Sequence, residues 1–231
     1  MDRALILRAV DLSKTYSVGK IHVPVLNKIN LELERGDLAA IQGPSGSGKT
    51  TLLNMLGGLD TPTSGEVWIE RLNIALMKER ELSRIRCRKI GFVFQFYNLI
   101  PNMSALYNVE LPMIFAGTSK HKRRQKALSL LKTVGLADKL SNCPHELSAG
   151  EQQRIAVARA LANDPALVLM DEPTGNLDKE NTTNIISLIR ELNNARAQTF
   201  VLTTHDPMIT ECAQKKLTLH HGKITQGFKD A

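Results

Sequence analysis

The chain has 231 residues, 42% hydrophobic and 23% charged, which is enough for one substantial domain or for one domain with an insert. No stretch approaches the ~20 consecutive apolar residues of a membrane span, and the apolar run at residues 4–7 is too short for a signal peptide, so we expect a cytosolic chain. Three scattered cysteines without C-x-x-C spacing predict neither a zinc site nor disulfides, and a net charge of +7 is compatible with nucleic acid, an anionic membrane surface or a nucleotide site.

The first predicted elements are β-strands. Residues 4–16 and 24–33 alternate apolar and polar side chains, and residues 65–70 do the same after the turn signal TPTSG. This alternation is typical of half-exposed antiparallel strands. It predicts an antiparallel β subdomain near the N-terminus.

Three later segments are continuous apolar runs instead: residues 38–41, 166–170 and 199–204. Such runs are typical of parallel strands that are covered on both faces. Helical patterns lie at residues 151–163 and 181–194. Strands that alternate with helices in this way predict a doubly wound α/β core with a parallel sheet.

A glycine-rich loop, residues 43–51 (GPSGSGKTT), follows the apolar run at residues 37–42 and precedes a helical pattern at residues 51–59. Its spacing matches G-x-x-x-x-G-K-[ST], the loop that wraps the phosphates of ATP or GTP. A strand before the loop and a helix after it are the context that this motif requires. We call residues 43–51 the phosphate loop.

The chemistry of the phosphate loop follows from its residue types. Gly43, Gly46 and Gly48 are expected to adopt positive φ angles and to let the backbone approach an anion, at the positive end of a helix dipole. Lys49 is expected to contact the β- and γ-phosphates, and the Thr50 hydroxyl to ligate Mg²⁺. The predicted nucleotide-binding residues here are Gly43, Pro44, Ser45, Gly46, Ser47, Gly48, Lys49, Thr50 and Thr51.

Residues 97–143 contain no parallel-strand run and have mainly helical patterns. They predict a helical subdomain inserted between two parts of the α/β core, residues 1–96 and 144–231. The tail, residues 221–231, is expected to fray after a final strand and turn.

The densest basic cluster lies inside this helical segment, at Lys120, His121, Lys122, Arg123, Arg124 and Lys126. Two interpretations stay open: a solvated helix face, and a surface close to lipid headgroups. No aromatic residue interrupts the cluster, which argues against a platform for stacking single-stranded nucleic acid.

Acidic and basic groups follow two of the apolar strands. Asp171 and Glu172 come at the end of residues 166–170, at the carboxyl edge of the sheet where ligands bind. Asp171 is predicted to hold Mg²⁺ and Glu172 to orient or deprotonate an attacking water. His205 follows residues 199–204 to the same edge, and although a lone histidine is more often a structural hydrogen-bonding group, this position favours a role at the phosphate.

A second anion-binding helix start is predicted at residues 148–151, the signature segment. Ser148 and Glu151 have the spacing of a capping box, and the small Ala149 and Gly150 leave the N–H groups of the first turn open.

Six segments, in this order, resemble the motifs of ABC transporter ATPases: GPSGSGKT, FVFQ with Gln95, LSAGE, ALVLMDE, GNLD with Asp178, and THD with His205. The resemblance covers essentially the whole chain. It implies a single ABC ATPase domain over residues 1–231, with the P-loop NTPase (RecA-like) parallel-sheet core, the antiparallel β subdomain and the helical insert.

The resemblance also implies a homodimer in which two ATP molecules lie between the phosphate loop of one copy and Ser148, Ala149, Gly150 and Glu151 of the other. Gln95 would reach Mg²⁺ and report on the nucleotide, Glu172 would polarise the water and His205 would hold the γ-phosphate. Together with Lys49, Glu172 and His205 form the expected catalytic set, and Thr50, Gln95 and Asp171 the expected metal set. Asp178 would lie at the dimer seam.

Tyr16 matches the aromatic residue that stacks on adenine in this family. From the sequence alone, it could equally be a surface residue at a strand end.

The signature departs from the usual LSGGQ at two positions. Ala149 disfavours a positive φ, and Glu151 places an anion near phosphates. In a capping box, however, Glu151 accepts a hydrogen bond from the Ser148 backbone, which offsets that cost. Related exporters also carry Glu here, and every catalytic position is filled, so we expect an active ATPase.

Longer phrases such as MDEPTGNLD resemble the branch of macrolide-export and lipoprotein-releasing (MacB/LolD-type) ATPases. These pair with integral membrane permeases and couple ATP hydrolysis to export from the cytoplasmic side of the inner membrane, where we expect this chain as a peripheral subunit. Alternatives are an FtsE-like cell-division ATPase, a soluble ABC ATPase acting on nucleic acid, and a nucleotide-sensing scaffold. The single cassette without sustained heptads argues against nucleic acid as a partner.

Overall fold

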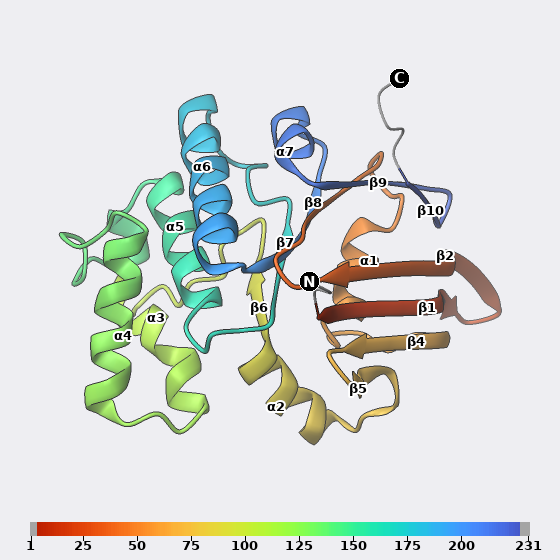
Figure 1. Ribbon diagram of the computed structural model, residues 1–231, viewed down its shortest axis with the longest axis horizontal. Coiled ribbons are helices and arrows are strands. Elements are labelled where there is room, and N and C mark those ends of the chain that lie inside the picture. The colour runs from red at the N-terminus through yellow and green to blue at the C-terminus, as the bar shows by residue number, and fades with distance from the viewer. Residues whose placement is uncertain (1–3, 227–231) are drawn as a thin grey trace.

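A six-stranded sheet runs through the centre of the molecule (Figure 1). The computed structural model describes residues 4–226 and orders the strands β10-β9-β3-β8-β7-β6. All neighbours are parallel except β10, which pairs antiparallel with β9. The strands are β3 (Leu38–Gln42), β6 (Ile90–Val93), β7 (Leu167–Asp171), β8 (Thr199–Thr204), β9 (Lys215–His220) and β10 (Lys223–Gln226).

The three apolar runs become β3, β7 and β8, which confirms their prediction as parallel strands. The short strand β6 was not predicted. Part of the tail that was expected to fray is ordered, because residues 223–226 form β10 and pair with β9; residues 227–231 lie outside the described residues.

The two faces of the parallel sheet bury different halves of the core. In β7, Val168 and Met170 belong to one apolar cluster, whereas Leu167 and Leu169 belong to the other. Consecutive strand residues point to opposite faces, so only a strand that is covered on both sides needs an unbroken apolar run. This is the physical reason why these segments do not alternate.

The second sheet is antiparallel, in the order β2-β1-β4-β5. Its strands are β1 (Leu5–Val18), β2 (Ile21–Glu34), β4 (Ser64–Ile69) and β5 (Leu72–Asn73). The predicted antiparallel β subdomain is therefore confirmed. Its inward side chains join α1 (Lys49–Leu56) in one of the two clusters, so the phosphate loop leads into a helix that is packed between the sheets.

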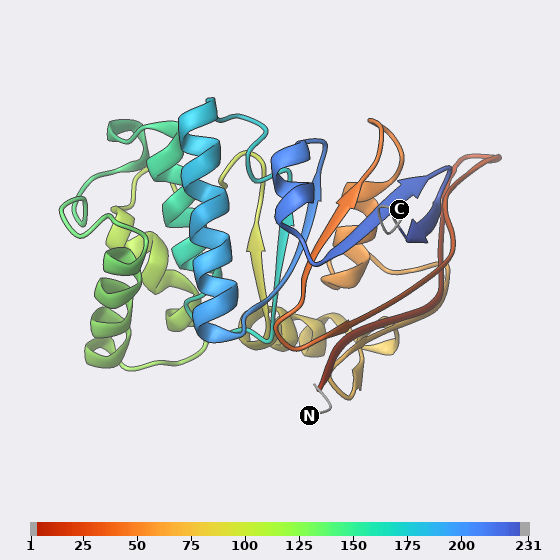
Figure 2. The same cartoon turned by 45° about the horizontal axis from the view of Figure 1, so that its top comes forward.

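Helices cover the other side of the parallel sheet (Figure 2). The predicted helical patterns become α5 (Ala149–Ala160) and α6 (Lys179–Arg196). Residues 97–143 hold α3 (Ala105–Phe115) and α4 (Lys120–Thr133), which pack on each other and on α5. The remaining elements are the 3-10 turns Ile74–Leu76 and Pro144–Glu146, with α2 (Glu79–Lys89) and α7 (Pro207–Cys212).

Candidate functional site

The phosphate loop lies at the carboxyl end of β3, and two of its three glycines have the expected conformation. Gly46 and Gly48 have φ angles of 77° and 100°. Gly43 does not have a positive φ, so that part of the prediction is wrong. Gly43 serves close packing instead, because a Cβ there would lie 2.3 Å from the Leu219 carbonyl oxygen and 2.7 Å from Ser47 Oγ. Ser47 Oγ is buried without a hydrogen-bond partner in the described chain, which leaves an unused polar atom in the loop.

Lys49 is held inside the loop. Its Nζ donates to the carbonyl oxygens of Gly43 (2.9 Å) and Pro44 (3.3 Å) and lies 3.5 Å from Glu172 Oε1. The side chain is buried, yet it borders the cavity over the loop. A cation is thus fixed where an anion can enter from solvent.

Asp171 joins three elements at this edge. Its Oδ2 accepts a hydrogen bond from Thr50 Oγ1 (2.9 Å) at the start of α1, and its Oδ1 accepts one from Thr203 Oγ1 (2.6 Å) in β8. Asp171 and Thr203 are direct neighbours in the β7–β8 register. Thr203 was not predicted from the sequence: it lies one residue before the end of β8, and its contact with Asp171 depends on β7 and β8 being neighbours in the sheet.

The oxygens of Thr50 and Asp171 suit Mg²⁺, a hard cation that binds few protein ligands and completes its shell with water and phosphate. Within residues 4–226 there is no cluster of three or more His, Cys, Asp or Glu residues able to hold a metal by themselves.

Glu172 and His205 face each other across the same edge. Glu172 adopts a φ of 46° directly after β7, and its backbone N–H donates to the Thr203 carbonyl. Its Oε2 is hydrogen-bonded to His205 Nδ1. The glutamate is largely buried, whereas the histidine side chain is 69% exposed, so His205 links the carboxylate to the open side of the cavity.

Many of these residues line one cavity of about 650 Å³, although Ser47, Asp171 and Thr203 do not. It is lined by Val25, Gly43, Pro44, Ser45, Gly46, Gly48, Lys49, Thr50, Thr51, Gln95, Glu172 and His205. The structure therefore brings together most of the residues predicted for phosphate binding. The signature segment, Tyr16 and Asp178 are not among the lining residues.

Gln95 reaches the cavity from the segment after β6. Its carbonyl accepts a hydrogen bond from Asn176 Nδ2 (2.9 Å). Tyr97 and Asn98, just beyond it, both have positive φ angles, and the Arg159 guanidinium donates to both of their carbonyls. Burial lowers the pKa of Arg159 to about 10, so the guanidinium stays charged at neutral pH. Arg159 and Asn176 were not predicted, because nothing local in the sequence marks such distant contacts.

The signature segment forms the predicted capping box at the start of α5. Ser148 Oγ accepts from the Glu151 backbone N–H, and Glu151 Oε2 accepts from the Ser148 backbone N–H (2.8 Å). This last hydrogen bond lowers the pKa of the Glu151 carboxyl, which stays ionised. Ala149 is the first residue of α5 and does not have a positive φ, so its methyl group causes no backbone strain.

Gly150 is required by packing. A Cβ at this position would lie 2.0 Å from Asn181 Oδ1, while Asn181 itself is hydrogen-bonded to the Asp178 carboxylate. Ser148 and Ala149 are exposed, so the open first turn of α5 faces outward.

Comparison with known proteins decides the family. Residues 26–175 match the family model described as ABC transporter. The chain belongs to the ABC transporter family. The match spans the phosphate loop, Gln95, the signature segment and Glu172, while Tyr16, Asp178 and His205 lie outside it.

Individual ABC transporter proteins are similar over nearly the whole chain. The lipoprotein-releasing system ATP-binding protein LolD of Saccharophagus degradans is 44% identical, over 96% of this chain and 97% of its own. The macrolide export ATP-binding/permease protein MacB of Syntrophobacter fumaroxidans is 45% identical over 93% of this chain, which corresponds to 30% of MacB. A solved dimer of the ATP-binding cassette MJ0796, in a post-hydrolysis state with ADP and Pi, has a TM-score of 0.90 and 40% identity, covering 98% of this chain and all of that chain.

These similarities confirm the predicted family, its fold class and its ATPase activity. None of the helices described for this ABC transporter subunit is long and apolar enough to span a membrane.

Tyr16, the predicted adenine-stacking residue of this ABC ATPase, is already fixed by two neighbours. Its hydroxyl donates to Asp60 Oδ2 (2.7 Å), and Lys14 Nζ lies 4.7 Å from the ring centroid. Lys14 also donates to Asp60 Oδ1 (2.6 Å). Burial and the Asp60 hydrogen bond raise the pKa of Tyr16; burial opposes ionisation of Asp60, yet the hydrogen bonds from Lys14 and Tyr16 lower its pKa overall. The ring remains partly exposed, as stacking on a base requires.

If Asp60 positions this ring, Asp60→Asn raises the KM for ATP about 2- to 10-fold with little change in kcat, the effect of losing one hydrogen bond outside the phosphate site. Steady-state kinetics provide the measurement. Tyr16→Phe, which keeps the ring, is expected to have a smaller effect than Tyr16→Ala. An unchanged KM in both Asp60→Asn and Tyr16→Ala would remove Tyr16 from the nucleotide site.

Proposed function

We propose that this ABC transporter ATPase drives a membrane permease of the lipoprotein-releasing and macrolide-export branch. The proposal is supported by the two similar proteins, LolD and MacB, whose names describe lipoprotein release and macrolide export. In this proposal residues 1–231 form one ABC ATPase domain, with the α/β core at 1–96 and 144–231 and the helical subdomain at 97–143.

The observation that carries the mechanism is that two helix N-termini able to bind anions, those of α1 and α5, lie apart in one copy of the chain. The phosphate loop lines the nucleotide cavity, whereas the signature segment does not and instead exposes Ser148 and Ala149 to solvent. Both starts suit phosphate groups. We therefore propose a homodimer in which the signature segment of one copy covers the nucleotide held by the phosphate loop of the other. The similar cassette MJ0796, whose solved structure is a dimer with ADP and Pi bound, supports the dimer.

Within each site, we assign Lys49 and the loop N–H groups to the β- and γ-phosphates of ATP. Glu172 lies at the edge of the cavity, where it can accept a proton from an attacking water, and His205 holds the Glu172 carboxylate and reaches towards the γ-phosphate. Thr50 and Asp171, with Gln95, would hold Mg²⁺, which neutralises phosphate charge when bound. His205 and Thr50 are exposed in one copy alone, so the second copy would exclude bulk solvent from around the attacking water.

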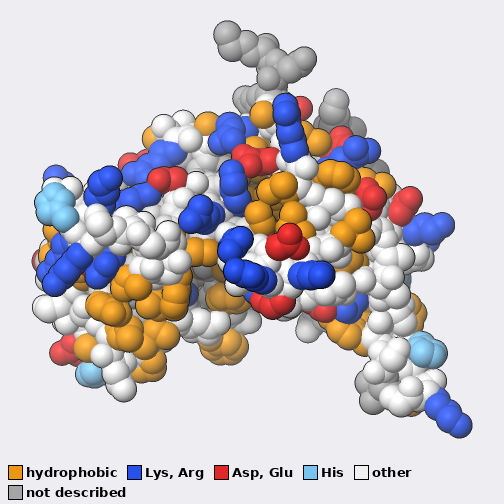
Figure 3. All heavy atoms as spheres, turned by 90° about the horizontal axis from the view of Figure 1, so that it is seen from below, with side chains coloured by type: hydrophobic (Ala, Val, Ile, Leu, Met, Phe, Trp, Pro, Cys, Tyr) orange, Lys and Arg blue, Asp and Glu red, His pale blue; other side chains and the backbone are white. Residues whose placement is uncertain are grey.

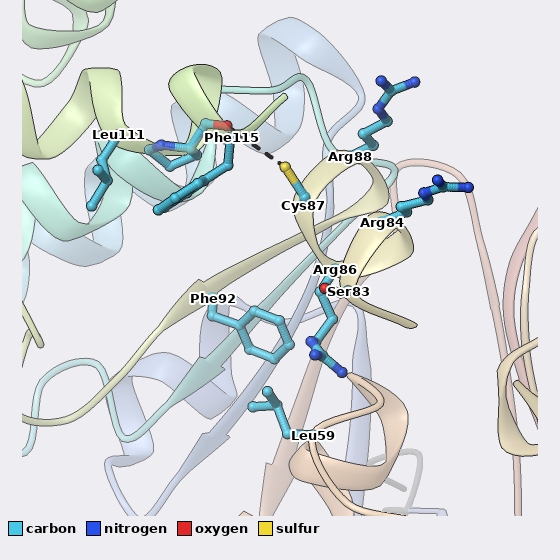
Figure 4. A pocket seen from close by; sticks show the side chains of 10 residues that line it. Leu59, Ser83, Arg84, Arg86, Cys87, Arg88, Phe92, Leu111 and Phe115 are labelled. Carbon is cyan, nitrogen blue, oxygen red and sulfur yellow. Dashed lines mark hydrogen bonds between the residues drawn. The ribbon is translucent and has the colours of Figure 1, made fainter. Parts of the chain in front are cut away.

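A groove away from the nucleotide suits the permease. It has a volume of about 840 Å³ and lies between α2 and α3, lined by Leu59, Ser83, Arg84, Arg86, Cys87, Arg88, Phe92, Leu111, Pro112 and Phe115 (Figure 4). Phe115 is 75% exposed, and arginines border its apolar floor. We propose that a short amphipathic helix of the permease, with acidic residues, docks here.

Phe115→Ser is expected to reduce recovery of the permease about tenfold or more, the loss typical of an aromatic anchor. The measurement is the amount of permease that co-purifies from detergent-solubilised membranes, with the permease identified by mass spectrometry. Leu76→Ser is the matched control, because Leu76 is 82% exposed and does not line the groove. Equal recovery with both variants would contradict docking in the groove.

This proposal places the protein as a peripheral subunit on the cytoplasmic side of the inner membrane. The FtsE-like alternative shares the same site and differs in the permease. Co-purification therefore separates the alternatives, since a protein recovered with nucleic acid and without an integral membrane partner would refute the transporter assignment.

A further inference from the structure

The positive charge of this protein is concentrated in two helices. α4 contains six Lys or Arg and no Asp or Glu, and α2 contains five Lys or Arg against two Glu. Together these helices carry a net charge of +9, whereas the whole chain carries +7, so the remainder is slightly negative. The net positive charge of the chain therefore comes from α2 and α4. It is not spread evenly over the surface, as a charge that served only solubility would be.

Many of these cations are not neutralised by the protein. Arg86 pairs with Glu79, Arg123 with Glu110 and Lys126 with Asp164. Apart from Lys132 in the last turn of α4, five exposed cationic side chains of these two helices have no ion-pair partner in the described part of the chain: Lys120 and Lys122 of α4, and Arg80, Arg84 and Arg88 of α2. We call these five residues the basic surface.

The two halves of the basic surface lie on one side of the molecule. α2 and the turn between α3 and α4 both lie at the bottom of Figure 1, and Figure 3 views the molecule from that side. Lys and Arg side chains gather on this face around apolar side chains. Arg84 and Arg88 also line the groove, but in the close view their side chains extend away from Phe115 and Leu59, so they can meet lipid headgroups before a permease occupies the groove (Figure 4).

We propose that the basic surface binds the anionic headgroups of a lipid bilayer, independently of any permease. Lysine and arginine side chains next to a negatively charged leaflet are each attracted to it, and their contributions accumulate. Apolar side chains between the two cationic groups add contact with the interface. The cations flank an apolar region and do not form one continuous track, which suits a broad charged sheet better than the narrow phosphate backbone of a nucleic acid.

This binding would also orient the protein. It would turn α2, α3 and the groove between them towards the membrane before a permease is engaged. Diffusion over the bilayer would then replace a search through the whole cytosol. The inference goes beyond the proposed function, since it assigns a second partner to residues that do not line the nucleotide cavity.

The test is co-sedimentation of the full chain with vesicles that contain no protein. The wild type is expected to bind vesicles of phosphatidylglycerol and phosphatidylcholine at low salt and to be released at high salt, and not to bind vesicles of phosphatidylcholine alone. Lys120→Gln/Lys122→Gln should weaken partitioning roughly 10- to 30-fold, the loss expected for two cations at an anionic leaflet.

The matched control is Lys216→Gln/Lys223→Gln, which removes two exposed lysines from β9 and β10 on another part of the protein. It is expected to bind within about twofold of the wild type, since charges beyond the screening length contribute little. ATPase activity and thermal unfolding verify that both double variants are folded.

Equal losses in the two double variants would overturn the proposal, as would binding to phosphatidylcholine alone or no binding to the anionic vesicles. Tighter binding to a random DNA duplex, lost in Lys120→Gln/Lys122→Gln, would assign the surface to nucleic acid instead. Because the vesicles carry no permease, these outcomes are independent of the Phe115→Ser experiment.

Discussion

Glu172→Gln is expected to keep ATP binding while lowering the rate of hydrolysis about 10²- to 10⁴-fold, the usual contribution of a general base. Glutamine has the same shape as glutamate but cannot accept the proton of the attacking water. The backbone of Glu172 is fixed by its hydrogen bonds to Thr203, so the substitution should not move the site. Phosphate release measures turnover, and equilibrium binding of a fluorescent ATP analogue measures affinity.

The same variant tests the dimer. If the signature segment of one copy covers the ATP of the other, slow hydrolysis should trap this closed state. Glu172→Gln with ATP is then expected to elute as a dimer from a sizing column, and with ADP as a monomer. Glu211→Gln is the matched control, an exposed glutamate in α7 that does not line the cavity. Hydrolysis at the wild-type rate in Glu172→Gln would remove Glu172 from its proposed role.

Lys49→Ala is expected to weaken ATP binding about 10- to 100-fold, because it removes a charge-assisted contact to phosphate from a water-poor loop. The ammonium group is held by two carbonyls and lies beside Glu172, so it is already in position to meet the phosphates. Adenosine, which lacks phosphates, should bind both forms equally. Isothermal titration with ATP and with adenosine therefore separates loss of the phosphate contact from general damage.

Two controls complete this experiment. Lys216→Ala removes an exposed lysine that does not line the cavity and should leave ATP affinity unchanged. Lys49→Arg keeps the charge but not the compact ammonium, and should recover only part of the affinity. Unchanged ATP affinity in Lys49→Ala would contradict the assignment of the phosphate loop.

The sequence is most informative where local rules decide the structure. The phosphate loop, the capping box at Ser148 and Glu151, and the buried strands β3, β7 and β8 all follow from residue types within a few positions of each other. Asp171 and Glu172 follow from the position of β7, since the carboxyl edge of a parallel sheet is known once the strands are known.

The missed elements depend on contacts that are distant in the chain. Strand β6 has only four residues, and one of them is Gly91, a residue type that is more typical of loops than of strands. Its glycine is required because a Cβ would lie 2.3 Å from the Ala160 carbonyl oxygen, a contact with the end of α5 that no local pattern reveals. Helix α2 lacks a buried apolar stripe, since none of its side chains is fully buried, and so gives no periodic signal.

The error at Gly43 has the same origin. Its motif predicts a positive φ, but the reason for glycine is the close approach of Leu219 from β9, a strand more than 170 positions away. The support of Tyr16 by Asp60 likewise depends on how the antiparallel sheet is placed over the phosphate loop. Such reasons become visible only once the sheets are assembled.

Helix α5 has a different partner at each end. It begins at the signature segment. In its last turn, Arg159 donates hydrogen bonds to the backbone carbonyls of Tyr97 and Asn98, which lie shortly after Gln95 in the chain. In the proposed dimer, Gln95 contacts the nucleotide of its own copy while the signature segment contacts the nucleotide of the other. A rigid helix joined to both would make the two ATP molecules thermodynamically coupled, so ATP hydrolysis should depend sigmoidally on ATP concentration.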